Sequence, residues 1–194
     1  IVIDPHKHGL QPYGCGCVMF RDPSVGTLYK HDSPYTYFSS GDMHLGEITL
    51  ECSRPGASAV ALWATHRLLP PVPGGEFGDD LDRCLRAARS LWRELHKSSY
   101  FTPLMQPELD IVVYAVNADT TSAASKRARE VFDAAAERDL HLALIELPAE
   151  LFGAHAPDFT VDTDSVACLR SVLMKPEHEE WVERLTALLE ASAQ

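Results

Sequence analysis

The sequence of 194 residues predicts an α/β protein organised in two parts. In the second part, apolar runs of strand length alternate with segments whose apolar residues recur at helical spacing, as expected for strands and helices in layers. The predicted strands are 110–116, 140–147 and 166–174, and the predicted helices are 121–138 and 177–191. A proline- and glycine-rich run, Pro70–Gly75, separates them from a first part that opens with a strand, a turn and a second strand.

The first 22 residues predict this strand, turn and strand. An apolar run ends at Asp4, Pro5 turns the chain, and Cys15–Phe20 forms the second strand, with His6 and Lys7 in the turn. A lysine after a strand is ordinarily a solvated loop residue. A partly desolvated lysine, however, loses its charge easily, and its free amine then attacks a carbonyl. Lys7 is therefore either a surface residue or a nucleophile.

The remainder of the first part carries weaker signals. Residues 23–46 contain prolines and glycines without a sustained period, so we expect a long, partly ordered loop. Glu47–Glu51 alternates like a short strand. Ser53 and Pro55 suit the start of a helix over Ala59–Leu69, and the free N–H groups at such a start favour an anion.

A long amphipathic helix is predicted after the proline- and glycine-rich run, with Gly78-Asp79-Asp80 as its cap. Its apolar face is formed by Leu81, Leu85, Ala88, Leu91 and Leu95. We expect Trp92 in the core. The opposite face is expected to be solvated and consists of Arg83, Arg86, Arg89 and Arg93.

Composition argues against two classes of function. The formal net charge of −11, without a long basic cluster, is not that of a nucleic-acid-binding protein. No run approaches the roughly 20 apolar residues that span a bilayer, and the beginning lacks the basic and apolar regions of a signal peptide.

The cysteines, at 15, 17, 52, 84 and 168, are odd in number and lack a disulfide-like spacing. We therefore expect reduced thiols and a cytoplasmic location.

Two groups of side chains could bind a metal, but neither completes a ligand set. Cys15 and Cys17 would place two thiols on one face of a strand without a second pair, so small apolar packing is the preferred interpretation. The other group is His6 and His8 with His31 or His44. Nothing supplies a well-spaced third ligand there, and we expect no metal.

The opening segment also resembles a known family. Asp4-Pro-His-Lys7, followed by Gly9, Pro12-Tyr13 and Val18–Asp22, closely resembles the cofactor-lysine segment of the group II pyridoxal-phosphate decarboxylases. Ser53–Ala57 and Leu169–Pro176 resemble two further segments of that family, so the resemblance covers most of the chain.

The resemblance implies a fold-type I enzyme in which residues 1–75 form the C-terminal part of the large, cofactor-binding domain. That part holds the cofactor lysine, a mobile loop and an interface helix. Residues 76–194 are then a linking helix and the small C-terminal domain. It also implies an N-terminal half, on a separate or cleaved chain, as a partner, and a homodimer of the complete unit.

The same resemblance assigns roles to individual residues. Lys7 is expected to bind pyridoxal 5'-phosphate covalently, with His6, Gly56 and Ser58 at the cofactor phosphate. A loop tyrosine of the family protonates the substrate carbon in the neighbouring subunit, and Asp32-Ser-Pro-Tyr35 matches its position best. Tyr37 is the alternative. Asp4 is too near the lysine to pair with the pyridine nitrogen, whose aspartate lies upstream in such enzymes.

We therefore expect decarboxylation of an L-amino acid, with an aromatic substrate as a family-weighted interpretation. Two alternatives stay open. The first is an aminotransferase or a carbon–carbon lyase of the same fold, because fold-type I aminotransferases hold the substrate carboxylate with an arginine in the region of Arg170. The second is a non-catalytic assembly subunit of a split enzyme, against which the intact Lys7 argues.

Overall fold

The computed structural model describes residues 1–31, 44–48 and 56–194, and the chain divides into two units, Ile1–Pro71 and Val72–Gln194. Within the described ranges, no helix combines the length and the apolar character that crossing a membrane would require.

The first unit opens with two short antiparallel strands, β1 (Val2–Ile3) and β2 (Cys17–Val18). They confirm the predicted strand, turn and strand, but β2 is shorter than the expected Cys15–Phe20. Gly14 lies before it with a φ of +91°, a conformation that suits glycine and does not continue a strand. The backbone therefore joins the ladder only after this glycine.

Two predictions for the first unit are wrong. Part of the expected loop is a 3-10 helix, η1 (Pro23–Tyr29), whose first turn is capped by the Asp22 carboxylate on the N–H of Ser24. The strand expected over Glu47–Glu51 is instead a helical turn, α1 (Leu45–Ile48), over its first two residues, and the rest lies outside the described residues. The Glu47 side chain accepts a hydrogen bond from the N–H of His44 at 2.9 Å, as in a capping box, and this local bond outweighs the alternation.

Helix α2 (Ala57–Leu68) begins two residues before the predicted start and confirms the helix expected there. Two contacts bind it to the opening segment. The side-chain amide of Gln11 donates to the hydroxyl of Thr65 at 2.7 Å, and the thiol of Cys15 lies 3.6 Å from the carbonyl oxygen of Ser58. Residues 11–15 therefore run along α2, from its C-terminal half toward its start.

The second unit is built on a four-stranded antiparallel sheet in the order β3-β4-β6-β5. The predicted strands appear as β4 (Ile111–Val116), β5 (Ala143–Pro148) and β6 (Ser165–Val172). The edge strand β3 (Phe101–Pro103) was not expected, because three residues are too short for a periodic signal.

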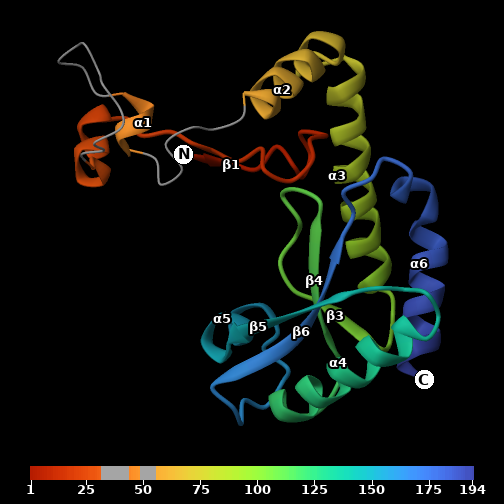
Figure 1. Cartoon of the computed structure of the whole chain (residues 1–194). Helices are drawn as coiled ribbons and strands as arrows, with labels where there is room; N and C mark the ends of the chain where they lie inside the picture. Colours follow the sequence, from red (N-terminus) through yellow and green to blue (C-terminus); the bar gives the residue numbers. More distant parts are fainter. Residues whose placement is uncertain (32–43, 49–55) are drawn as a thin grey trace. The chain divides into compact units, whose positions relative to one another are not determined.

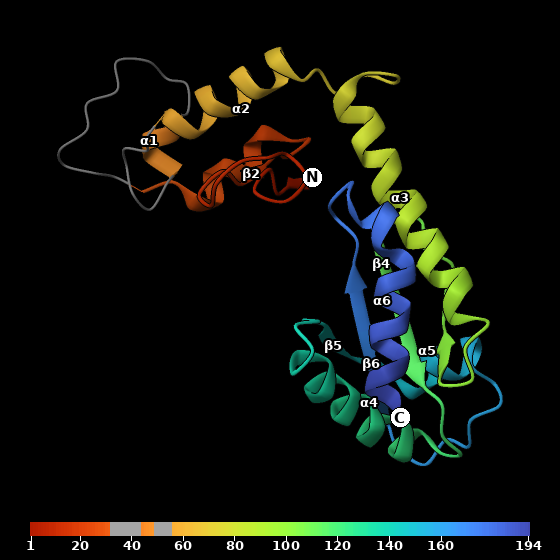
Figure 2. The same cartoon turned by 90° about the vertical axis from the view of Figure 1, so that its right-hand side faces the viewer.

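Three helices cover one face of this sheet: α3 (Glu76–Leu95), α4 (Thr121–Ala136) and α6 (His178–Ala193). Their apolar residues form one core with the side chains of β4 and β6, and Figures 1 and 2 show α3 and α6 side by side. The short helix α5 (Ala149–His155) packs on the opposite face through the buried Phe152. The helices expected at 121–138 and 177–191 are thus confirmed.

The predictions for α3 are partly wrong. The helix starts at Glu76, because Gly75 in an extended conformation precedes it, and not at the predicted cap around residue 79. Arg83 and Arg86 are not simply solvated, since both pair with Glu179 of α6, Arg86 at 2.6 Å. Trp92 packs against the core as expected.

Candidate functional site

The turn that carries Lys7 is held by its own backbone. The N–H of Lys7 donates to the carbonyl of Asp4 at 3.0 Å, and the N–H of Gln11 donates to the carbonyl of Pro5 at 3.1 Å. Pro5 is buried, and Gly9 packs so closely on it that a Cβ at Gly9 would lie 2.7 Å from its backbone. The turn is therefore compact, and it has little freedom to rearrange.

Lys7 projects from this turn with a mostly exposed side chain and forms an ion pair with Asp4, at 2.8 Å between Nζ and Oδ2. The hydrogen bond from Lys7, followed by its positive charge, lowers the pKa of the Asp4 carboxyl. The pair directs the amine across the turn. The desolvation that would favour the free amine is not supplied by the described residues around it.

Sequence reasoning excluded Asp4 from one role but missed its contact with Lys7. The sequence does contain a signal for this contact, because Asp4 and Lys7 carry opposite charges and stand three residues apart around the turn at Pro5.

His6, the neighbour of Lys7, is half-buried. Its imidazole lies against the ring of Tyr13, with 5.0 Å between the ring centroids. This contact restricts the orientation of the imidazole.

The predicted anion site at the start of α2 has part of the expected geometry. Gly56 precedes the helix and has no side chain that could cap it. No capping side chain of the described residues therefore accepts a hydrogen bond from the first N–H groups of α2. Within the described parts of the chain, no hydrogen bond or ion pair joins Lys7 or His6 to Gly56 or Ser58. The described residues thus do not join the two halves of the predicted cofactor site by a polar contact.

The remaining predicted site residues are the loop tyrosines and the possible metal ligands. Tyr35 and Tyr37 lie outside the described residues, as do Cys52 and Ser53. No group of three or more potential metal ligands occurs in the ranges that the structure describes. Cys15 is buried beside α2, which agrees with the apolar packing expected for it.

Arg170 lies in the central strand β6, opposite Val113 of β4 and Ala143 of β5. Side chains alternate along a strand, so Arg170 shares a face with Cys168, which belongs to the core under α5 and not to the three-helix face. Its Nε is buried and has no hydrogen-bond acceptor among the described residues. A guanidinium nitrogen in this state is a donor available to a carboxylate.

No protein-family model matches the chain, but curated relatives do. An L-tyrosine decarboxylase of Enterococcus faecium is 32% identical over 124 residues, which are 58% of this chain and 20% of that enzyme. A probable L-tyrosine/L-aspartate decarboxylase of Methanosarcina barkeri is 33% identical over 113 residues, which are 58% of this chain and 26% of the relative. The matched part thus spans about a fifth to a quarter of the relatives' length.

The fold is similar to that of a solved structure described as Oryza sativa TDC with PLP and tryptamine, with a TM-score of 0.75 and 15% identity. The match covers all of this chain and 38% of that one. The chain is thus similar in sequence to parts of enzymes named as decarboxylases of tyrosine or aspartate, and it has the fold of a part of a fold-type I enzyme. Both findings agree with the resemblance to the group II pyridoxal-phosphate decarboxylases.

Proposed function

We propose that this chain is the C-terminal half of an amino acid decarboxylase that uses pyridoxal 5'-phosphate to convert an L-amino acid to its amine and carbon dioxide. The observation that carries the proposal is the compact turn Asp4-Pro-His-Lys7, with its projecting amine, in a chain whose matched relatives are named decarboxylases. The relatives extend well beyond the matched part, so we further propose that an N-terminal half completes the site.

The residues present fit this cofactor. Lys7 offers an exposed amine on a stiff turn, where it can bond to an aldehyde. Asp4 pairs with that amine at 2.8 Å, and His6, the preceding residue of the same turn, is the proposed partner of a phosphate oxygen. When bound, the cofactor supplies an electron sink for the charge left on the α-carbon as carbon dioxide departs. Tyr35, or alternatively Tyr37, then delivers a proton to that carbon.

The arrangement of the described residues is in keeping with a homodimer. Among them, no hydrogen bond or ion pair joins Gly56 or Ser58 to Lys7 or His6 of the same chain, yet a helix start suits a phosphate. We propose that they serve the cofactor held by the second subunit. The cytoplasm is the proposed compartment, in keeping with the free thiols of Cys15, Cys84 and Cys168.

An aromatic L-amino acid is the proposed substrate class. Its support is that the relatives are named for L-tyrosine and that the similar rice structure contains tryptamine. The archaeal relatives are also named for L-aspartate, so an acidic substrate is the first competitor in an activity panel.

One observation favours a second candidate function. The buried Nε of Arg170 lacks an acceptor among the described residues, and a guanidinium is well suited to a substrate carboxylate, as in an aminotransferase or a carbon–carbon lyase. Released carbon dioxide identifies the decarboxylase, whereas a keto acid identifies the aminotransferase. A complex that binds the cofactor but yields neither product would support an assembly subunit.

The central experiment is to copurify the chain with its N-terminal half, reduce the complex with borohydride in the presence of the cofactor, and map the labelled peptide. We expect the label on Lys7 and its loss in Lys7→Ala. Lys97→Ala is a matched control, because Lys97 is also exposed and pairs with an acid three residues away, Glu94, at 2.7 Å. A label on any other lysine would contradict the proposal.

The loop tyrosine requires its own test. Tyr35→Phe should slow decarboxylation or increase side reactions, because the proton must then come from water. Unchanged rate and unchanged product ratio would remove Tyr35 from the site, and the same measurement on Tyr37→Phe then decides the alternative.

A further inference from the structure

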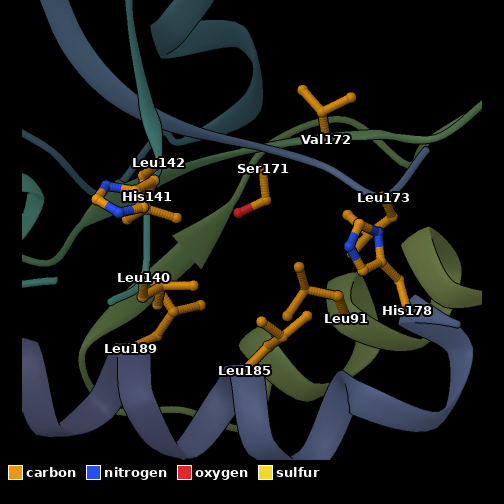
Figure 3. A pocket seen from close by; sticks show the side chains of 10 residues that line it. All are labelled: Leu91, Leu140, His141, Leu142, Ser171, Val172, Leu173, His178, Leu185 and Leu189. Carbon is orange, nitrogen blue, oxygen red and sulfur yellow. The ribbon is translucent and has the colours of Figure 1, made fainter. Parts of the chain in front are cut away.

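The second unit contains a cavity of about 160 Å³ that no part of the proposed function uses. It lies between the helix-covered face of the sheet and helices α3 and α6 (Figure 3). Six of its ten lining side chains are leucines, among them Leu91 of α3 and Leu185 and Leu189 of α6. The exposed His141 lies at its edge.

The size and lining of the cavity suit a single small ring. An engineered cavity of about 150 Å³ lined by aliphatic and aromatic side chains stays dry and binds benzene. Leu91, Leu140, Leu173 and Leu189 are buried in the core shared by the three helices and the sheet, so packing holds most of the wall in place. The remaining two leucines, Leu142 and Leu185, pack against that core, and the wall at residues 140–142 belongs to the connection that precedes β5.

One polar group breaks the apolar lining. Ser171 lines the cavity, and Figure 3 shows its hydroxyl turned toward the leucines. Its oxygen lies 2.9 Å from the hydroxyl of Tyr114, which is completely buried. The two hydroxyls carry two protons, and the bond between them uses one. Among the described residues neither hydroxyl has a further hydrogen-bond partner, so Ser171 retains an unused donor or acceptor at the cavity wall.

The lining favours an uncharged ligand. Among the residues that the structure describes, no aspartate, glutamate, lysine or arginine contributes to the cavity wall. His178, at the start of α6, is half-buried, and this burial lowers its pKa, so its imidazole is mainly neutral at neutral pH. A charged ligand would lose its hydration here without gaining a partner of opposite charge.

We propose that this cavity binds a small, uncharged aromatic molecule with one hydroxyl group, its ring packed among the leucines and its hydroxyl bonded to Ser171. The inference concerns the second unit alone and does not depend on the proposed decarboxylase activity. Phenol is the simplest probe of this class, and toluene is the matched probe without the hydroxyl.

The first test needs no variant. Phenol is titrated into the full chain with ¹³C-labelled leucine methyl groups, and the methyl resonances are followed by NMR. We expect saturable shifts at Leu91, Leu185 and Leu189, with a dissociation constant on the order of 1 mM for so small a ligand. Leu104 and Leu147, in the core on the opposite face of the sheet, are the internal control and should not move. Non-saturable or uniform shifts would overturn the proposal.

Variants then test the hydroxyl. Ser171→Ala should weaken phenol binding about fivefold, the effect of one hydrogen bond, and leave toluene binding unchanged. Ser99→Ala, an exposed serine of the same unit outside the cavity lining, is the matched control. Equal phenol affinity in Ser171→Ala and the unmodified chain would refute the role of Ser171. Leu142→Phe, which fills the cavity from its wall, should abolish binding of both probes, and retained binding would show that they bind elsewhere.

Discussion

Replacing Tyr114 with phenylalanine tests the packing of the second unit with the loss of a single oxygen. The ring of Tyr114 is completely buried and meets Phe101 edge to face, with 5.5 Å between centroids, and phenylalanine retains this contact. Only the 2.9 Å bond to Ser171 is lost. We expect the free energy of unfolding near neutral pH to fall by about 1 to 1.5 kcal/mol, because Ser171 borders the cavity and is not sealed in apolar surroundings.

The pH dependence of this variant gives a sharper test. Burial raises the pKa of the Tyr114 hydroxyl above its ordinary value of 10.0. A group with a raised folded pKa contributes stability that is complete below its unfolded pKa and is lost as the pH rises toward the folded value. The unmodified chain should therefore lose stability above about pH 10 through Tyr114, and Tyr114→Phe should lose less.

Buried thiols contribute to the same alkaline loss. Burial raises the pKa of Cys84 and, to about 12, that of Cys168. Both thiols are present in both proteins, so their effect cancels when the two proteins are compared at each pH.

The assay is urea unfolding followed by circular dichroism at about pH 8 and pH 10.5, on either side of the unfolded tyrosine pKa. Tyr100→Phe, at a half-buried tyrosine of the same unit, is the control and should change stability by less than about 0.5 kcal/mol. Equal stability of Tyr114→Phe and the unmodified chain at pH 8 would refute the hydrogen-bond argument. An unreduced alkaline loss in the variant would refute the assignment to Tyr114.

Three further predictions probe the fold. Phe152→Ala should lower the free energy of unfolding by about 3 to 5 kcal/mol, because Phe152 is completely buried. Leu151→Ala, at the partly exposed neighbouring residue, should lower it much less. Similar losses for the two variants in urea unfolding would contradict the core under α5. Gly9→Ala should make the first unit more sensitive to limited proteolysis, because the new Cβ meets backbone at 2.7 Å, while Gly16→Ala, with open space around it, should not. Asp162 accepts hydrogen bonds at the start of α4 that lower its pKa to about 2, so its stabilisation is complete above its ordinary value of 3.8 and lost as the pH falls toward 2. Asp162→Asn should thus be less stable than the unmodified chain at pH 7 but nearly equal to it near pH 2 in the same unfolding assay.

Long periodic segments were predictable because burial repeats along them. The continuous apolar run Ile111–Val116 indicates a strand with neighbours on both faces, and the spacing of Ala128, Val131 and Ala135 identifies one face of a helix. In both cases the information lies within a few residues or turns. Short elements were not predictable. Strand β3 depends on pairing with β4, and α1 depends on local bonds such as the one that the Glu47 side chain accepts from the N–H of His44, so neither leaves a repeat in the sequence.

The candidate site also contains one part that was predictable from the sequence and one part that was not. Lys7 and His6 were found because a short motif places them together on one turn. The link between Gln11 and Thr65 joins residues far apart in the sequence, and only the fold reveals it. The environment of the Arg170 Nε, which has no acceptor among the described residues, also depends on two neighbouring strands, so sequence alone could name this residue but not its surroundings.

The order of strands in the second unit has a consequence for synthesis on the ribosome. Strands β4 and β5 do not pair with each other, and both depend on β6, which is the last strand to be made. The growing chain therefore exposes apolar strands without a central partner until residues 165–172 have left the exit tunnel. Nascent chains that stall before that point should be chaperone substrates, and this unit should fold in one late step and not strand by strand.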